Sequence, residues 1–219
     1  MAEGPTEVGF VSVLLQRALG GPLTQFGVHI SNGGGHEFTL ELLEALKAGG
    51  LSFGGFADDE DGKHSTRWKK LRDPLGLLLF RWPKGCLEEN VFAATPLEML
   101  EALMADPLGE RTGMRRQTLT LRLGIEAKSF AEVEAAAGEK LKPTMIEAAL
   151  GTVPRGCEED KGTFKAHGGT WFKSVHGGRE LGGKLFCLGL WPALKSQLLP
   201  FCNSVRGALK LPAVEDMPS

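Results

Sequence analysis

Several features that assign a protein quickly to a class are missing from this chain. It contains no tyrosine, which excludes chemistry that depends on a tyrosine nucleophile. No run of about eighteen apolar residues is present, so we expect no membrane-spanning helix. The N-terminus also lacks the basic and then apolar pattern of an export signal. These absences predict a cytoplasmic protein that does not associate with membranes.

The cysteine spacing and the net charge indicate neither a zinc site nor a nucleic-acid partner. The four cysteines, Cys86, Cys157, Cys187 and Cys202, show no C-x-x-C pairing, which favours free thiols over a zinc cluster. The formal net charge is −2, so no overall basic field indicates nucleic-acid binding. Hydrophobic residues make up 42% of the chain and charged residues 24%, as in ordinary globular proteins.

The residues that stand out are carboxylates, gathered in two clusters about fifty residues apart. The first is Glu3-Gly4-Pro5-Thr6-Glu7, and the second is Asp58-Asp59-Glu60-Asp61-Gly62, which follows an apolar run. Adjacent carboxylates repel one another unless water or a divalent cation screens them. Open α/β sheets bind their ligands where strands end. The clusters therefore predict a magnesium or manganese site, and a solvated turn is the alternative for the second cluster.

Apolar periodicity predicts alternating helices and strands in the first half of the chain. Helices are expected at 8–19, 37–47 and 63–72, and strands at 26–30, 51–57 and 77–82. This order predicts an α/β fold with a doubly wound, mainly parallel sheet flanked by helices over residues 1–95. Residues 96–211 are expected to form a mainly helical part whose last helix, from about 193 to 209, breaks at Pro200. Residues 212–219 are expected to be a disordered tail.

One difficulty concerns Glu3. An acidic residue at a strand end requires a strand just before it, and only Met1 and Ala2 precede Glu3 in the sequence. The sequence therefore leaves Glu3 poorly anchored.

The order of the motifs resembles that of a Toprim domain. Glu3-Gly4-x-Thr6-Glu7 is followed by the acidic cluster at 58–61 and then by Gly85-Cys86-Leu87-Glu88-Glu89-Asn90. The closest likeness is to the C-terminal nuclease half of the OLD (overcoming lysogenization defect) family of ATP-dependent endonucleases. The resemblance covers about residues 1–95 and implies a cytoplasmic DNA endonuclease or nickase with a role in phage defence. It also implies hydrolysis of phosphodiester bonds with two Mg²⁺ or Mn²⁺ ions.

The resemblance also assigns candidate site residues. Glu3 and Glu7 match the first acidic motif. The Asp-x-Asp motif matches either Asp58 with Glu60 or, in the other register, Asp59 with Asp61. The later glutamate matches Glu88 or Glu89. The lysine that would steady the scissile phosphate matches Lys173, with Lys184 as the second choice.

Basic residues beside the acidic loop are candidates for DNA-backbone contact. These residues are Lys63, Arg67, Lys69 and Lys70. A solvated helix face is the alternative for this stretch, and it is the favoured prediction for Arg111, Arg115, Arg116 and Arg122. Trp171 is expected in the core rather than as a base-stacking platform. The segments around Trp171 and Gly177 are expected to form a loop ahead of a helix.

The sequence also departs from the family pattern. It contains no Walker A motif, so the ATPase half of OLD proteins is missing and would have to come from a region absent from this chain or from a separate chain. Gly33-Gly34-Gly35-His36 lacks the P-loop lysine and is predicted as a loop, with phosphate contact through its N–H groups as the alternative. The expected partners are DNA, an ATPase and a second copy of the chain. The alternative function is a non-catalytic Toprim-type module for interaction or nucleic-acid binding.

Overall fold

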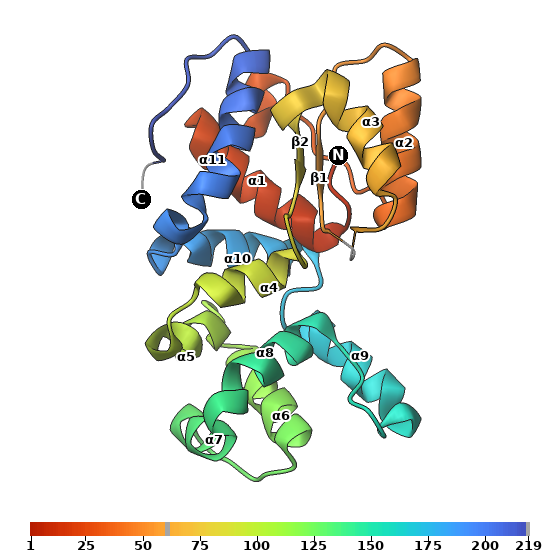
Figure 1. The fold of residues 1–219 in the computed structure, drawn as a ribbon. Coiled ribbons are helices and arrows are strands. Elements are labelled where there is room, and N and C mark those ends of the chain that lie inside the picture. The colour runs from red at the N-terminus through yellow and green to blue at the C-terminus, as the bar shows by residue number, and fades with distance from the viewer. Residues whose placement is uncertain (60–61, 218–219) are drawn as a thin grey trace.

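The computed structural model describes residues 1–59 and 62–217 as a mixed α/β protein, 65% helical, with a small parallel sheet (Figure 1). The strands are β1 (Gly55–Ala57) and β2 (Leu79–Arg81). The helices are α1 (Pro5–Leu19), α2 (His36–Ala48), α3 (Ser65–Leu75), α4 (Leu87–Ala94), α5 (Leu100–Met104), α6 (Thr112–Leu123), α7 (Phe130–Ala137), α8 (Leu141–Leu150), α9 (Lys161–Thr170), α10 (Val175–Cys187) and α11 (Trp191–Ala208). The 3₁₀ turns are η1 (Leu23–Phe26), η3 (Gly76–Leu78), η4 (Leu97–Met99), η5 (Gly138–Lys140) and η6 (Glu158–Asp160).

Residues Met1–Glu3 lie between β1 and Asn32 as a short bridging segment, which we call the central strand. Strands β1 and β2 pair in parallel, with Phe56 opposite Phe80, and Ala2 forms parallel bridges to both Phe56 and Asn32. The N–H of Ala2 donates to Ser31 O at 2.9 Å, and the N–H of Glu3 donates to Phe56 O at 3.0 Å. The expectation that Glu3 is poorly anchored is therefore wrong, because three residues are enough to bridge both neighbours.

The strand predicted at 26–30 is not formed. Phe26 ends η1, and Gly27 follows with φ 65°, in the left-handed region that suits glycine and interrupts an extended strand. Only Asn32, beyond this segment, pairs with the sheet. The predicted break at Pro200 is also wrong, since α11 runs through this proline and directs Phe201 onto the rings of Phe56 and Phe80.

Helices α1 and α10 approach each other through glycines. A Cβ added at Gly178 would lie 2.8 Å from the carbonyl carbon of Thr6, and one at Gly9 would lie 2.6 Å from the N of Arg179. The predicted loop around Gly177 is instead part of α10, which begins earlier because the Ser174 hydroxyl caps it, accepting the N–H of Gly177 at 2.9 Å. Glycine is required at these helical positions because a Cβ atom would prevent the backbones of α1 and α10 from coming this close.

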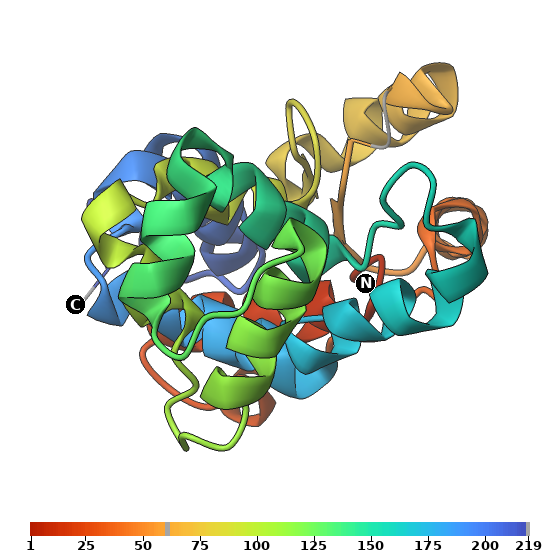
Figure 2. The same cartoon turned by 90° about the horizontal axis from the view of Figure 1, so that it is seen from below.

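The main hydrophobic core crosses the domain boundary predicted at residue 95. It joins α1 and the sheet to α4, α10 and α11, and it continues into α6–α8 through the fully buried Trp171, a core residue as predicted. Seen from below, the helices from α6 to α9 lie toward the viewer, in front of α1 and α10 (Figure 2). The carboxyl ends of the strands point toward α4 (Figure 1).

A buried ionic cluster ties α6 to α10. The guanidinium of Arg115, predicted on a solvated face, is fully buried and donates to both oxygens of Glu180 at 2.6 and 2.7 Å. Glu180 also pairs with Lys184 at 2.8 Å. The Arg115 guanidinium donates further to the carbonyls of Met104, Thr170 and Trp171. The prediction for Arg115 was wrong because sequence periodicity could not reveal a carboxylate on a distant helix.

The C-terminal segment packs against α11 rather than remaining a disordered tail. Asp216 accepts a hydrogen bond from the indole N–H of Trp191 at 2.6 Å, and Met217 is buried. Asn203 exchanges two hydrogen bonds of 2.9 Å with the backbone of Val214. The prediction is therefore wrong for residues 212–217, and residues 218–219 lie outside the described part. Within the described residues, no single helix has both the length and the apolar character to cross a membrane.

Candidate functional site

Four carboxylates from four segments gather where the strands end. Glu3 follows the central bridge, Glu7 lies in the first turn of α1, Asp58 follows β1 and Glu88 lies in the first turn of α4. Oε2 of Glu3 accepts the N–H of Asp58 at 3.0 Å, and Oδ1 of Asp58 accepts the N–H of Leu87 at 3.0 Å. All four side chains are buried. We call Glu3, Glu7, Asp58 and Glu88 the carboxylate cluster.

Local structure explains how two of these residues reach the cluster. Glu7 and Glu88 both lie at helix N-termini, where the helix dipole favours negative charge. Gly4 leaves room for the first, because a Cβ at this position would lie 2.7 Å from Oε2 of Glu7. Gly85, with φ 67°, makes the turn that leads from β2 into α4.

The carboxylate cluster holds more negative charge than its surroundings compensate. Burial, with further repulsion from Glu7 and Glu88, raises the pKa of Asp58 to about 9. Burial, and then the charge of Glu88, raises the pKa of Glu7 to about 7. In the metal-free protein at neutral pH, the cluster therefore retains protons that exposed carboxyl groups would have lost.

Glu88 is the most isolated member of the cluster. It is fully buried, and neither carboxylate oxygen accepts a hydrogen bond from any described residue. Nζ of Lys173 lies 3.4 Å from Oε1 of Glu88. Burial opposes the charge of Lys173, but Glu88 and the neighbouring Glu7 outweigh this effect and raise its pKa. Lys173 therefore remains a cation, and its side chain is 42% exposed, so the charge is accessible from solvent.

Other predicted site residues lie elsewhere. Lys184 is directed to Glu180 and to the carbonyls of Leu103 and Ala105, away from the cluster. Asp59 pairs with Arg81 at 3.2 Å, and Glu89 accepts the N–H of Cys86 at 2.8 Å as a cap of α4. Asp58 rather than Asp59, and Glu88 rather than Glu89, therefore belongs to the cluster. Glu60 and Asp61 lie outside the described residues.

The predicted DNA-contact residues lie on or next to α3. Lys63, Lys69 and Lys70 are exposed. Arg67 donates to both oxygens of Glu44 on α2, at 3.0 and 2.6 Å. Lys69 and Lys70 can therefore reach a phosphate from the exposed face of α3, whereas the guanidinium of Arg67 is already paired with Glu44.

Sequence reasoning missed three residues that organise the cluster. Nδ1 of His36 lies 3.3 Å from Oε2 of Glu3, and the indole N–H of Trp68 donates to Nε2 of His36 at 3.0 Å. Nε of Arg81 donates to Asp58 O at 3.2 Å, and its Nη2 donates to Asp59 O. The sequence carries no signal for these roles, because none of the three residues stands at a position that a metal-binding motif would mark.

The glycine loop does not form a phosphate cradle. The N–H groups of Gly33 and Gly35 donate to Ala2 O and Glu3 O, at 2.8 and 2.9 Å, and that of Gly34 donates to the side chain of Asn32. The alternative of phosphate contact through this loop is therefore wrong, because its donors are used to hold the central strand.

The chemistry of the donor set fits a divalent cation. The cluster offers only carboxylate oxygens, the ligands that Mg²⁺ and Mn²⁺ prefer, and the buried carboxylate of Glu88 lacks a hydrogen-bond donor among the described residues. In the same part of the chain, however, no three His, Cys, Asp or Glu side chains are already arranged to hold a metal ion. The side chains would therefore have to adjust as a cation enters.

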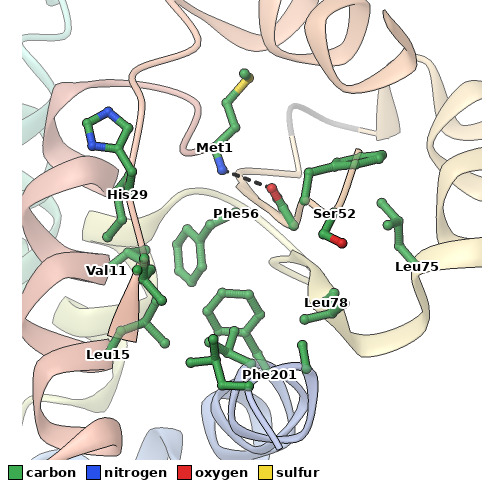
Figure 3. Close-up of a pocket in the computed structure, with 18 of the residues that line it drawn as sticks. Met1, Val11, Leu15, His29, Ser52, Phe56, Leu75, Leu78 and Phe201 are labelled. Atoms are coloured by element: carbon green, nitrogen blue, oxygen red, sulfur yellow. Dashed lines mark hydrogen bonds between the residues drawn. The ribbon is translucent and has the colours of Figure 1, made fainter. Parts of the chain in front are cut away.

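A separate cavity of about 490 Å³ lies at the opposite, amino end of the strands (Figure 3). Val11 and Leu15 of α1, Phe56 and Phe201 supply apolar walls. The amino group of Met1 lines it and donates to Gly54 O at 2.8 Å. None of the described residues that line this cavity is a carboxylate, so the cavity is distinct from the cluster.

Comparisons of this chain with protein-family models, curated proteins and solved structures found no match.

Proposed function

We propose that this protein is a divalent-metal-dependent DNA endonuclease or nickase of Toprim type. The observation that carries the proposal is the carboxylate of Glu88, which is buried beside three further carboxylates and accepts no hydrogen bond from the described residues. The partly exposed Nζ of Lys173 lies 3.4 Å from it. A protein has little structural use for four carboxyl groups buried together, two of which, Glu7 and Asp58, have raised pKa values, whereas a cation-binding site requires such a group. The order of the acidic motifs in the sequence supports the same proposal.

The cluster residues would hold Mg²⁺ or Mn²⁺, two ions in the full proposal. When bound, such ions supply Lewis acidity and an activated water for hydrolysis of a phosphodiester. Lys173 supplies a positive charge beside the cluster that can neutralise a phosphate oxygen in the transition state. Lys69 and Lys70 on α3 would hold the DNA backbone by charge alone. An ATPase region or chain, a second copy of the protein and a cytoplasmic role in phage defence remain predictions from the resemblance.

Cleavage of supercoiled plasmid tests the proposal directly. We expect nicking or linearisation with Mg²⁺ or Mn²⁺ and none in EDTA. Asp58→Asn and Glu88→Gln should each abolish it. Glu89→Gln is the matched comparison, because Glu89 is adjacent in sequence but caps α4, and this variant should retain cleavage. Full cleavage by Glu88→Gln would contradict the proposed site.

A non-catalytic module for interaction or nucleic-acid binding is the second candidate. The absence of a ready-made three-residue metal group among residues 1–59 and 62–217 favours it. This candidate predicts no uptake of Mn²⁺ by calorimetry and equal binding of DNA with and without EDTA. Stoichiometric Mn²⁺ uptake that is lost in Asp58→Asn would favour the nuclease instead.

A further inference from the structure

The segment before α2 wraps around the central strand and brings His36 to Glu3. The N–H of Gly35, which has φ 115°, donates to Glu3 O at 2.9 Å, and the hydroxyl of Thr39 lies 3.4 Å from the same oxygen. His36 begins α2 directly after this turn. The side chains of His36 and Glu3 are each only 9% exposed, so water competes little for their contact.

Trp68 determines which nitrogen of His36 carries the proton. An indole N–H can only donate, so the Nε2 atom that it contacts at 3.0 Å must accept. The proton of the neutral ring is then on Nδ1, which faces Oε2 of Glu3 at 3.3 Å. Trp68 is itself 3% exposed and is held between α2 and Arg81, whose guanidinium lies 5.7 Å from its ring centre.

Two donors therefore meet on one oxygen of Glu3. The N–H of Asp58 and Nδ1–H of His36 both approach Oε2, which fixes the rotation of the carboxylate. The same carboxylate is a proposed cation ligand, and ligands of this kind depend on hydrogen-bonded partners for orientation and basicity.

We propose that His36, oriented by Trp68, is a positioning residue that sets the orientation of Glu3 for cation binding. This inference rests on the proposed metal-binding function. It adds a relay from the indole N–H of Trp68 through the imidazole of His36 to Oε2 of Glu3, linking α3 and α2 to the central strand.

Calorimetry with Mn²⁺ as the probe tests the relay. Loss of an orienting partner typically weakens metal affinity about 10–100-fold. We expect a weakening of this size for His36→Leu and a smaller one for Trp68→Phe, which leaves the imidazole free to change tautomer. His36→Asn should restore part of the affinity, because its amide N–H can replace Nδ1–H. His29→Leu is the control, since His29 is exposed at the other end of the sheet.

Nitrogen-15 NMR of the metal-free protein tests the geometry independently of metal binding. His36 should show a protonated Nδ1 and a bare Nε2, and Trp68→Phe should populate the other tautomer. A wild-type protein with the proton on Nε2 would overturn the inference. If the wild type binds Mn²⁺ and His36→Leu binds it equally well, the inference fails and the proposed function stands. If the wild type binds no Mn²⁺, both fail.

Discussion

The contact between α1 and α10 predicts that an added methyl group has opposite effects on stability at two positions of α10. It should destabilise the protein at Gly178 and stabilise it at Gly183. In Gly178→Ala, the new Cβ would lie 2.8 Å from the carbonyl carbon of Thr6, whereas carbon atoms in contact need about 3.5–4 Å. The atom it meets is backbone, so the two helices must separate by about 1 Å. In Gly183→Ala, nothing lies within 4 Å of the new Cβ.

The magnitudes follow from these surroundings. Overpacking costs about 1–3 kcal/mol and sometimes more, and replacing glycine by alanine within a helix gains about 1 kcal/mol. We expect Gly178→Ala to lose about 2 kcal/mol of unfolding free energy and Gly183→Ala to gain about 1 kcal/mol. Since 1 kcal/mol shifts Tm by about 2–4 °C at this size, the two variants should differ by about 6–12 °C. Thermal unfolding monitored by circular dichroism measures this difference.

A functional consequence accompanies the change in stability. Lys173 lies just before α10, and Glu7 lies on α1, so separation of the helices moves the lysine from the cluster. Gly178→Ala should therefore lose more cleavage activity than Gly183→Ala at temperatures where both remain folded. Equal Tm values for the two variants would refute the close approach of the helices.

Three further predictions concern buried charges. In EDTA, Glu88→Gln should raise Tm by a few degrees, because the repulsion that Glu88 exerts on Glu7 and Asp58 outweighs its pairing with the partly exposed Lys173, and a lower Tm would contradict this reasoning. Glu89→Gln should leave Tm nearly unchanged, because glutamine at this position of the capping box still accepts the N–H of Cys86. The folded pKa values of Glu7 and Asp58, about 7 and about 9, exceed their ordinary values of 4.5 and 3.8, so their contribution to stability is present in full at low pH and is lost as pH rises through the folded values. Urea titrations in EDTA should therefore show that the free energy of unfolding falls between about pH 5 and pH 9, by about 3 kcal/mol for Glu7 alone. Adding Mn²⁺ should restore the lost free energy. A free energy of unfolding that rises over this pH range would contradict the burial of the cluster. Arg115→Met should cost about 3–5 kcal/mol of unfolding free energy in the same assay, because it leaves three buried carbonyls without their donor and Glu180 with Lys184 as its remaining cationic partner; a loss below about 1 kcal/mol would contradict this role of Arg115.

The sequence was informative where a pattern is local. The helices around 8–19 and 37–47 and the paired strands β1 and β2 follow from apolar periodicity and glycine stops, and the structure confirms an α/β protein with a parallel sheet. The position of Asp58 at the end of β1 was also predictable, because it directly follows an apolar run.

The features of the fold and of the candidate site that the sequence did not predict depend on contacts between residues far apart in the chain. Nothing near Arg115 in the sequence shows that Glu180 will neutralise it, and nothing near His36 shows that Trp68 and Glu3 lie on either side of its ring. Which of Glu88 and Glu89 joins the cluster likewise depends on which of them caps α4. The sequence cannot show this, because the two residues are identical and adjacent and the exact start of the helix decides between them. The bridges of Ala2 escaped prediction because a single bridging residue is too short for any periodicity.

The pairing of Met1–Glu3 with the rest of the chain has a consequence during synthesis. Ala2 must wait for Asn32 and Phe56 before it has neighbours, and the hydroxyl of Thr6 donates to Phe172 O, 166 residues later. Contacts so far apart in sequence form slowly and late. A nascent chain on the ribosome therefore carries Glu3 and Glu7 long before it carries Lys173, and it completes the charged centre only when Lys173 has emerged.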